Sequence, residues 1–173
     1  ERGGALEMVQ LWVNLPKAFK MTAPRYQTLV DAEIPAVELD GGAGRVRVIA
    51  GEFRAVKGPA KTFSPVHLYD LRLKAGHRTE LNLPEGYNSS LFVLHGEVVM
   101  NGSQTVQEVE IALFGQRGER VVVEAKQDAT ILVLSGEPIA EPIARYGPFV
   151  MNTRDEIIQA VHDYQAGKMG HLS

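Results

Sequence analysis

The feature that most constrains the fold is a succession of short strand-like segments separated by turns that contain glycine. Alternating apolar residues and β-branched residues mark strands at residues 46–50, 66–73, 91–100, 108–114, 120–125 and 130–134. Glycines stand between most of them, at positions 41–42, 58, 76, 86, 102 and 115–118. No helical periodicity interrupts the series. The pattern predicts an all-β fold, an antiparallel sandwich or barrel.

The C-terminal stretch NTRDEIIQAVHDYQAGKMG is the exception, because it predicts one α-helix. Thr153 and Glu156 have the spacing of a capping box, and Gly167 is a natural stop. An apolar stripe is expected on one face, formed by Ile157, Ile158, Val161 and Tyr164. We therefore predict a packing helix rather than a DNA-recognition helix.

Composition excludes several classes of function. The chain has 173 residues, of which 45% are hydrophobic, so it can bury a substantial core. Its net charge is −3 and its basic residues are scattered, which argues against direct nucleic-acid binding. The absence of cysteine removes disulfides and thiolate chemistry, and no apolar run reaches the ~20 residues of a membrane span. We expect a cytoplasmic protein that has no membrane partner.

The interval from Gly76 to Gly96 resembles the first motif of the cupin barrels, G-x5-H-x-H-x4-E-x6-G. Both glycines fit, but the positions of the three metal ligands hold Asn82, Pro84 and Ser89. A non-haem iron site needs histidines and a carboxylate that converge from different strands. Residues 96–161, where a second cupin motif would supply another histidine, contain none. His77 and Glu80 could form a local pair, although their spacing is weak evidence. The sequence therefore predicts a cupin-type jelly-roll barrel that carries no metal ligands.

Three segments in order, QLWVNLP, KMTAPRYQ and GPFVMNTRDEIIQAVHDYQAGKMG, resemble the pirin family. The resemblance extends from residue 11 to residue 170. Pirins are bicupins, proteins of two stacked β-barrels, and the resemblance implies that this chain is the C-terminal half together with the last strand of the N-terminal barrel. Residues 1–38 would then be that remnant strand and a linker, and residues 39–173 a metal-free cupin barrel with a terminal helix.

The resemblance also implies where the chemistry lies. In pirins, three histidines and one glutamate within HPH and HSE motifs hold iron in the N-terminal barrel, and neither motif occurs here. Glu1 and Glu7 lack an HSE context, so we assign no catalytic, cofactor-binding or metal-binding residue to this chain and expect iron in the N-terminal half. We expect this chain to have a structural and interaction role. The alternatives are that it is part of an iron-dependent quercetin 2,3-dioxygenase, which opens a flavonol ring, or of a redox-responsive transcriptional co-regulator. A sugar-binding or isomerising cupin is conceivable from the fold alone.

A pocket or interface between the two barrels is the one site that the sequence indicates. Trp12 could line a cavity for an aromatic ligand or fill the core of the N-terminal barrel, and we favour the second interpretation. Interface packing is likewise expected for the residues of the connector. The candidate residues are Gln10, Trp12, Asn14, Lys20, Met21 and Tyr26.

The N-terminal segment ERGGALEMVQLWVNLP has no initiator methionine and reads as a cut within a longer protein. A strand is predicted at residues 8–15. An unpaired strand edge binds whatever strand is available. We therefore expect this segment to associate either with the N-terminal cupin half or with a second copy in a homodimer.

Overall fold

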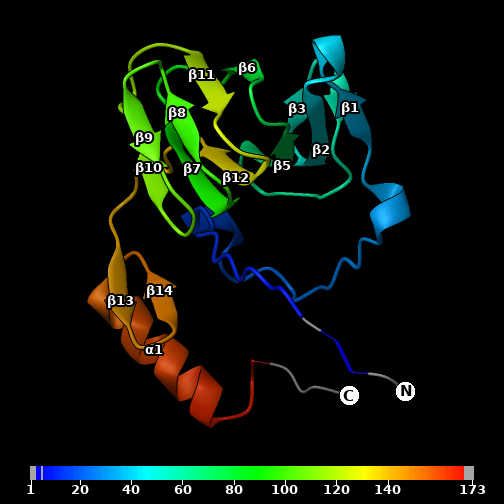
Figure 1. Cartoon of the computed structure of the whole chain (residues 1–173). Coiled ribbons are helices and arrows are strands. Elements are labelled where there is room, and N and C mark those ends of the chain that lie inside the picture. Colours follow the sequence, from blue (N-terminus) through cyan, green and yellow to red (C-terminus); the bar gives the residue numbers. More distant parts are fainter. Residues whose placement is uncertain (1–2, 5, 170–173) are drawn as a thin grey trace. The chain divides into compact units, whose positions relative to one another are not determined.

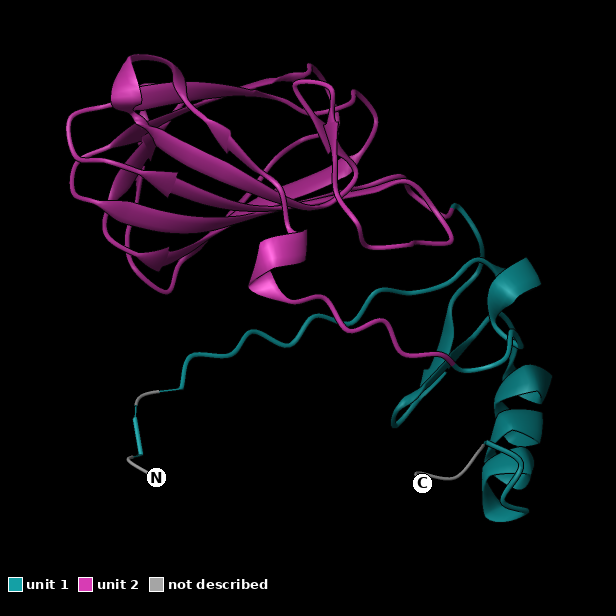
Figure 2. Cartoon of the chain, turned by 90° about the vertical axis from the view of Figure 1, so that its right-hand side faces the viewer, with its two compact units in different colours: residues 1–24, 140–173 teal, residues 25–139 magenta. Residues whose placement is uncertain are grey.

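The computed structural model describes residues 3–4 and 6–169, which form two compact units (Figure 2). One unit is residues 25–139, and the other combines residues 1–24 with residues 140–173. The sequence predicts a different boundary, at residue 38, between the remnant of the N-terminal cupin and the C-terminal cupin, and this boundary stays a prediction. No helix in the described part of the chain is long and apolar enough to cross a membrane.

The elements follow one another as shown in Figure 1. The strands are β1 (Ala36–Glu38), β2 (Gly44–Ala50), β3 (Glu52–Phe53), β4 (Val56–Lys57), β5 (Val66–Leu73), β6 (Arg78–Asn82), β7 (Asn88–His95), β8 (Val98–Met100), β9 (Gln104–Val106), β10 (Ile111–Leu113), β11 (Arg120–Ala125), β12 (Ala129–Gly136), β13 (Ala144–Tyr146) and β14 (Phe149–Met151). The helices are the 3₁₀ turns η1 (Lys17–Phe19), η2 (Asp31–Glu33) and η3 (Asp40–Gly42), and the α-helix α1 (Arg154–Gln165).

The 25–139 unit is the predicted all-β barrel. Its six-stranded sheet has the order β1-β2-β5-β12-β7-β10, and its four-stranded sheet has the order β6-β11-β8-β9. Each strand turns alternate residues inward, so that Tyr69, Leu71 and Leu73 of β5 face Val121 and Val123 of β11 within one core. The fold class is confirmed: a mostly β chain of cupin type with one C-terminal α-helix.

The single strand predicted at residues 91–100 is wrong, because the structure has two strands there. Strand β7 ends at His95 in the six-stranded sheet, and β8 begins at Val98 in the four-stranded sheet. Gly96 lies between them with φ +86, and a Cβ there would be 2.4 Å from the Asp128 carbonyl oxygen. The chain can change sheets at this point because glycine accepts both the positive φ and the close approach.

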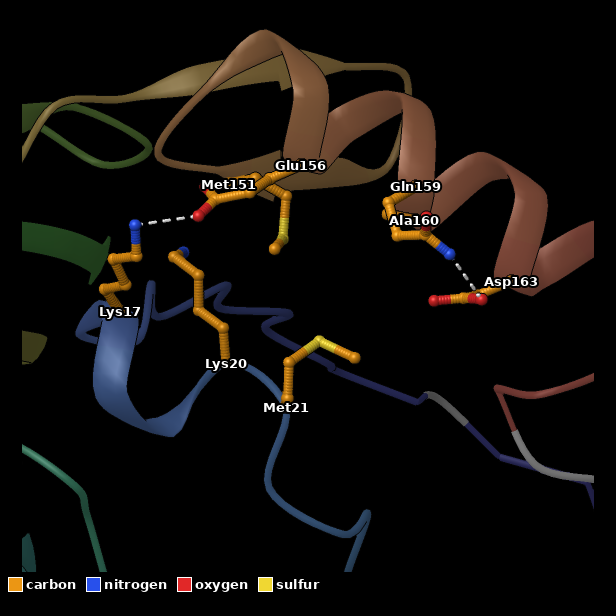
Figure 3. Close-up of a pocket in the computed structure, with 8 residues that line it drawn as sticks. All are labelled: Lys17, Lys20, Met21, Met151, Glu156, Gln159, Ala160 and Asp163. Carbon is orange, nitrogen blue, oxygen red and sulfur yellow. Dashed lines mark hydrogen bonds and ion pairs between the residues drawn. The ribbon is translucent and has the colours of Figure 1, made fainter.

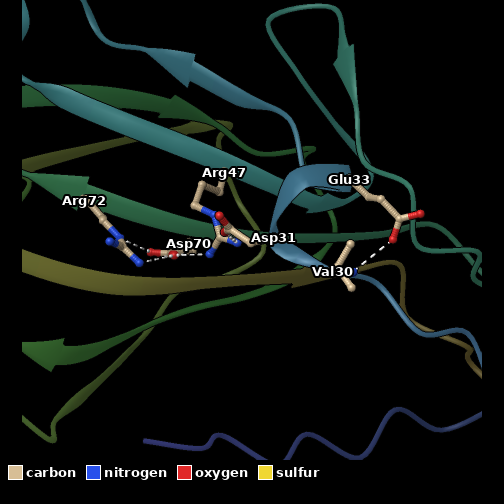
Figure 4. A network of polar contacts seen from close by, with 6 residues as sticks. All are labelled: Val30, Asp31, Glu33, Arg47, Asp70 and Arg72. Atoms are coloured by element: carbon tan, nitrogen blue, oxygen red, sulfur yellow. Dashed lines mark hydrogen bonds and ion pairs between the residues drawn. The ribbon is translucent and has the colours of Figure 1, made fainter.

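An ion-pair network fastens η2 to the outer face of the six-stranded sheet (Figure 4). Arg47 of β2 lies directly opposite Asp70 of β5, and its Nη1 is 2.8 Å from Asp70 Oδ2. The same guanidinium contacts Asp31 of η2 through Nη2, while Arg72 reaches Asp70 from the other side. Both Arg47 and Asp70 are largely shielded from water, so this cross-strand pair is screened less than a surface ion pair.

The other unit contains the β13–β14 hairpin and α1. The predicted capping box is present, because Thr153 Oγ1 accepts from the Glu156 amide and Glu156 Oε2 accepts from the Thr153 amide. Gly167, with φ +71, ends the helix: its amide donates to Tyr164 O, and the Lys168 amide donates to Asp163 O.

The predicted apolar stripe of α1 is partly wrong. Ile157 is buried together with Ala160, which the stripe left out, whereas Ile158 and Tyr164 are 48% and 64% exposed. Within its own unit the helix packs on β13 and β14, and a two-stranded hairpin covers only part of a helix surface.

Residues 8–15 have no regular secondary structure in this chain by itself, and the predicted strand that pairs with the N-terminal cupin half or a second copy stays a prediction. Leu11 and Val13 are 44% and 52% exposed, and the adjacent Trp12 is 69% exposed. A strand exists only through hydrogen bonds to a neighbour, and this segment pairs with no other described segment in a sheet.

Core packing yields a first prediction. Leu91 is fully buried and Leu113 is 78% exposed, although both lie in the six-stranded sheet. Leu91→Ala should lower the free energy of unfolding by about 2–5 kcal/mol, because it leaves a cavity between the sheets. Leu113→Ala should change it by less than about 0.5 kcal/mol. Urea unfolding of the full chain measures both, and equal effects would contradict the packing described above.

Candidate functional site

The positions of a cupin metal site do not converge on a metal cage. Asn82 is exposed at the end of β6, and Ser89 Oγ lies 2.8 Å from Ser135 Oγ in a hydrogen bond. Among residues 3–4 and 6–169, no three His, Cys, Asp or Glu side chains are grouped so that they could share a metal ion. Fully buried apolar side chains, such as Leu71, Leu91 and Ile131, fill the interior instead. The described side chains of this barrel do not fit an iron site.

The local pair of His77 and Glu80 is not formed. His77 Nδ1 lies 3.1 Å from the Ala75 carbonyl oxygen, and Glu80 pairs with Arg120 across the β6–β11 ladder at 3.4 Å. His95 ends β7 beside the Gly96 turn, with Nδ1 3.5 Å from Glu108. None of these contacts brings two histidines together.

The structure brings three of the candidate interface residues together. Lys20 Nζ donates to Asn14 Oδ1 at 2.7 Å and to the Val150 carbonyl oxygen at 3.0 Å. Lys20 and Met21 also line a groove beside α1, which Figure 3 shows from close by. The Lys20 ammonium thereby ties the N-terminal segment to strand β14.

The remaining candidates do not join this groove. Gln10 and Trp12 are exposed within the irregular segment, and Trp12 is 69% exposed. Tyr26 belongs to the 25–139 unit and is 89% exposed. Whether these side chains form one interface stays a prediction.

The groove has a volume of about 240 Å³ and mixes thioethers with charged groups. Its lining residues are Lys17, Lys20, Met21, Met151, Glu156, Gln159, Ala160 and Asp163. Lys17 Nζ forms an ion pair with Glu156 Oε1 at 2.8 Å. The Lys17 amide donates to Glu141 Oε2, which also accepts from Asn152 Nδ2. These contacts join η1, the start of α1 and the segment before β13.

The electrostatics of the groove oppose acid–base catalysis. Hydrogen bonding to Glu156 raises the pKa of Lys17 above its ordinary value. Hydrogen bonds from Lys17 and from the Asn152 and Thr153 amides lower the pKa of Glu156. Neither group changes its charge near neutral pH, whereas a general acid or base needs a pKa close to the working pH. The groove is suited to holding segments together or to recognition.

A second groove runs between β13 and α1, with a volume of about 570 Å³. Its apolar wall includes Ile157, Ile158 and Val161. Arg145 and Arg154 also line it, and neither makes an ion pair or side-chain hydrogen bond within the described residues. Apolar surface of this kind, bordered by charge, is typical of interaction sites.

Sequence reasoning missed most of both grooves. Lys17 and Glu156 are far apart along the chain, and no local pattern indicates that they pair. The sequence indicates Glu156 only as a capping residue. Its Oε2 accepts the hydrogen bond of the cap, and its Oε1 forms the ion pair with Lys17. The sole available signal was the charge of Lys17 and Lys20 at the start of the connector.

The sequence of this chain is similar to those of known proteins. The family described as the Pirin C-terminal cupin domain matches residues 68–170. A protein of Pseudomonas aeruginosa named "Putative quercetin 2,3-dioxygenase" is 51% identical over 166 residues, which are 96% of this chain and 58% of that protein. The Homo sapiens protein named Pirin is 36% identical over 167 residues, 94% of this chain and 57% of that one.

A solved structure gives the same result for the fold. The crystal structure of a quercetin 2,3-dioxygenase from Acinetobacter baumannii matches with a TM-score of 0.89 and 41% identity, over 94% of this chain and 56% of that chain. The chain therefore spans less than two thirds of the length of each of these relatives.

The Lys17–Glu156 pair predicts a pH dependence of stability. Because the pKa of Glu156 is lowered in the folded state, its carboxylate stabilises the fold above its ordinary pKa of 4.5, and this contribution is lost as the pH falls through the folded value. Glu156→Gln should therefore be less stable than the unchanged chain at pH 7, and the difference should shrink below pH 4.5. Thermal unfolding over a pH series measures this difference.

Asp155→Asn is the matched control, because it removes one carboxylate from the same helical turn. A smaller pH-dependent difference is expected for this variant than for Glu156→Gln. Identical pH profiles for the two variants would show that only the helix dipole, and not the Lys17 contact, is involved.

Proposed function

Because the chain belongs to the pirin family, we propose that it is the non-metal-binding cupin half of a pirin-like protein. Its role is structural: it supports an iron-containing N-terminal cupin and offers it an interaction surface. In this proposal the iron, and any chemistry at the iron, belong to the partner half.

The observation that carries this proposal is the filled barrel interior. Most inward positions of β2, β5, β7 and β12 hold side chains with relative exposure of 2% or less, among them Val48, Leu71, Val93 and Val133. Replacing such residues by metal ligands would bury polar groups at a cost of several kcal/mol unless a metal or hydrogen bonds satisfied them. A barrel packed in this way is built for stability and contact.

Exposed apolar side chains of the other unit supply the surface. Leu11, Trp12 and Val13 follow one another in the irregular segment and are 44%, 69% and 52% exposed. Monomeric proteins rarely leave contiguous apolar residues uncovered. We assign this segment to contact with the N-terminal cupin half, with a homodimer as the alternative. The proposed interface residues are Gln10, Trp12, Asn14, Lys20, Met21 and Tyr26.

A second candidate function is flavonol ring cleavage by the whole protein. It is favoured by the names of the P. aeruginosa relative and of the A. baumannii structure, both of which refer to quercetin 2,3-dioxygenase. This chain contributes no metal ligand to such a reaction in our proposal, and it would act by buttressing the iron half.

Trp12 reports on the proposed interface because it is the sole tryptophan. Adding the part of the P. aeruginosa relative that this chain does not cover should shift the Trp12 emission to shorter wavelength and raise the mass measured by light scattering. Val13→Asp should weaken this association at least tenfold, because it places a charge in the apolar contact. A blue-shifted dimer of the chain alone would indicate the homodimer instead.

Val109→Asp is the control, since Val109 is a 72% exposed valine in the other unit. It should leave the association unchanged. A monomer whose Trp12 emission does not change when the partner is added would contradict the proposal.

Quercetin turnover tests the proposal that this barrel binds no catalytic metal. The chain alone should not consume quercetin in the presence of oxygen and added iron(II), because its barrel has no fitting ligand set. The absorbance band of the flavonol measures consumption. Turnover by the isolated chain that a chelator stops would overturn the assignment of this barrel as metal-free.

A further inference from the structure

One end of the barrel interior is polar, unlike the rest. His67 of β5 lies opposite Ser135 of β12, and Ser135 lies opposite Ser89 of β7. Each of the three alternates in register with the buried residues of its own strand, and the two serine hydroxyl oxygens are 2.8 Å apart. Hydrogen-bonding groups from three adjacent strands therefore meet at this end of the barrel.

A chain of two hydrogen bonds fixes the protonation of His67. The Tyr69 hydroxyl donates to the Glu52 carbonyl oxygen at 2.6 Å, and it lies 2.7 Å from His67 Nδ1. The hydroxyl has one proton, and a carbonyl oxygen can only accept, so Nδ1 of His67 must be the donor to Tyr69. Burial raises the pKa of Tyr69 to about 12, which keeps this hydroxyl protonated. His67 is thus the Nδ1–H tautomer with a bare Nε2.

Nε2 remains available to a ligand. His67 lines a cavity of about 350 Å³. Its ring makes a side-chain hydrogen bond through Nδ1 and also a contact with the Glu52 backbone, whose carbonyl oxygen can accept only from a protonated ring nitrogen. Within the described part of the chain, Asn152 Oδ1 is the buried side-chain nitrogen or oxygen atom that has no hydrogen-bond partner. Nε2 of His67 is not such an atom, so it is not sealed from solvent. Burial also lowers the pKa of His67, which keeps the imidazole neutral near pH 7.

The cavity lining indicates a neutral ligand rich in hydrogen-bond donors. Glu52 and Lys57 face each other at 3.9 Å, so their charges offset. The Thr62 hydroxyl already donates to the Ser64 carbonyl oxygen, which leaves its oxygen as an acceptor. With His67 Nε2 and the Glu52 carboxylate, acceptors predominate over the one donor, Lys57.

We propose that this end of the barrel is a binding site for a small neutral polyol, such as a carbohydrate, with one hydroxyl donating to Nε2 of His67. A polyol meets both requirements, because each hydroxyl donates one hydrogen bond and can accept from Lys57. The cavity lies near the lower end of the volumes typical of small-molecule sites. Five of the six proposed interface residues lie in the other unit, and Tyr26, which lies in this unit, does not line the cavity.

The experiment is ¹⁵N-detected NMR of the histidine rings in the full chain, titrated with myo-inositol. The free chain should show His67 protonated at Nδ1 and bare at Nε2. Myo-inositol should shift the Nε2 resonance of His67 in a saturable manner and leave His77 and His95 unchanged. A proton on Nε2 in the free chain, or no shift of that resonance at 100 mM myo-inositol, would overturn the proposal.

His67→Asn is the matched variant, because an asparagine amide can still donate to Tyr69 and lacks the outer acceptor. Backbone amide shifts of strand β5 and myo-inositol affinity are measured together. The variant should keep the native backbone spectrum and bind about tenfold more weakly, since one hydrogen bond is lost. Unchanged affinity would overturn the proposal, and the tautomer reading on the unchanged chain tests it even if the variant unfolds.

Discussion

The apolar packing between the two sheets of the 25–139 unit is the constraint on which the rest of the structure depends. Every long strand gives alternate residues to this core, so a polar residue at an inner position must find partners there or stay out. Leu71, Leu91 and Val123 are fully buried members of this core. Packing and metal binding compete for the same volume in a barrel of this size, and we propose that this sequence uses the volume for packing.

As a consequence, the polar side chains of the barrel lie at one end of it and on its outer face. At the end, His67, Tyr69 and the Glu52 carbonyl form a directed chain of hydrogen bonds. On the outer face, Arg47 and Asp70 satisfy each other across neighbouring strands. Both arrangements follow the same rule, because each group that is partly removed from water has a partner of matching character.

The sequence predicted the elements that carry a periodic signal of sufficient length. Strands β5 and β11 are found at the predicted residues, since several alternations mark each of them. Strands β3 and β4 have two residues each, and β13 has three, which is too short for any alternation to register. The switch between sheets at Gly96 was not predicted either. His95, Gly96 and Glu97 interrupt the apolar residues there, but the sequence does not show that the partner strands change at this point.

Contacts between residues far apart in the sequence cannot be predicted from local patterns. This affects the prediction of the sites more than the prediction of the fold. The helix α1 was predictable from its capping box, which is a local signal, but the contact of Lys17 with Glu156 was not. Asn14 and Lys20 were chosen as interface residues and do contact each other, although the segment that precedes them has no regular structure. A strand is predicted from side-chain pattern alone, yet it forms only where a neighbour supplies its hydrogen bonds.

The state of His67 illustrates why a site can be read from a structure and not from a sequence. Its tautomer depends on the carbonyl group of Glu52. Glu52 comes directly after Gly51, where the backbone passes close to the His67 ring. A Cβ on Gly51 would lie 2.6 Å from His67 Nδ1 and 2.7 Å from the Val66 carbonyl oxygen, and Gly51 has φ +77. Only glycine permits both the turn and the contact. Glycine at position 51 therefore permits the close approach of this turn to the His67 ring.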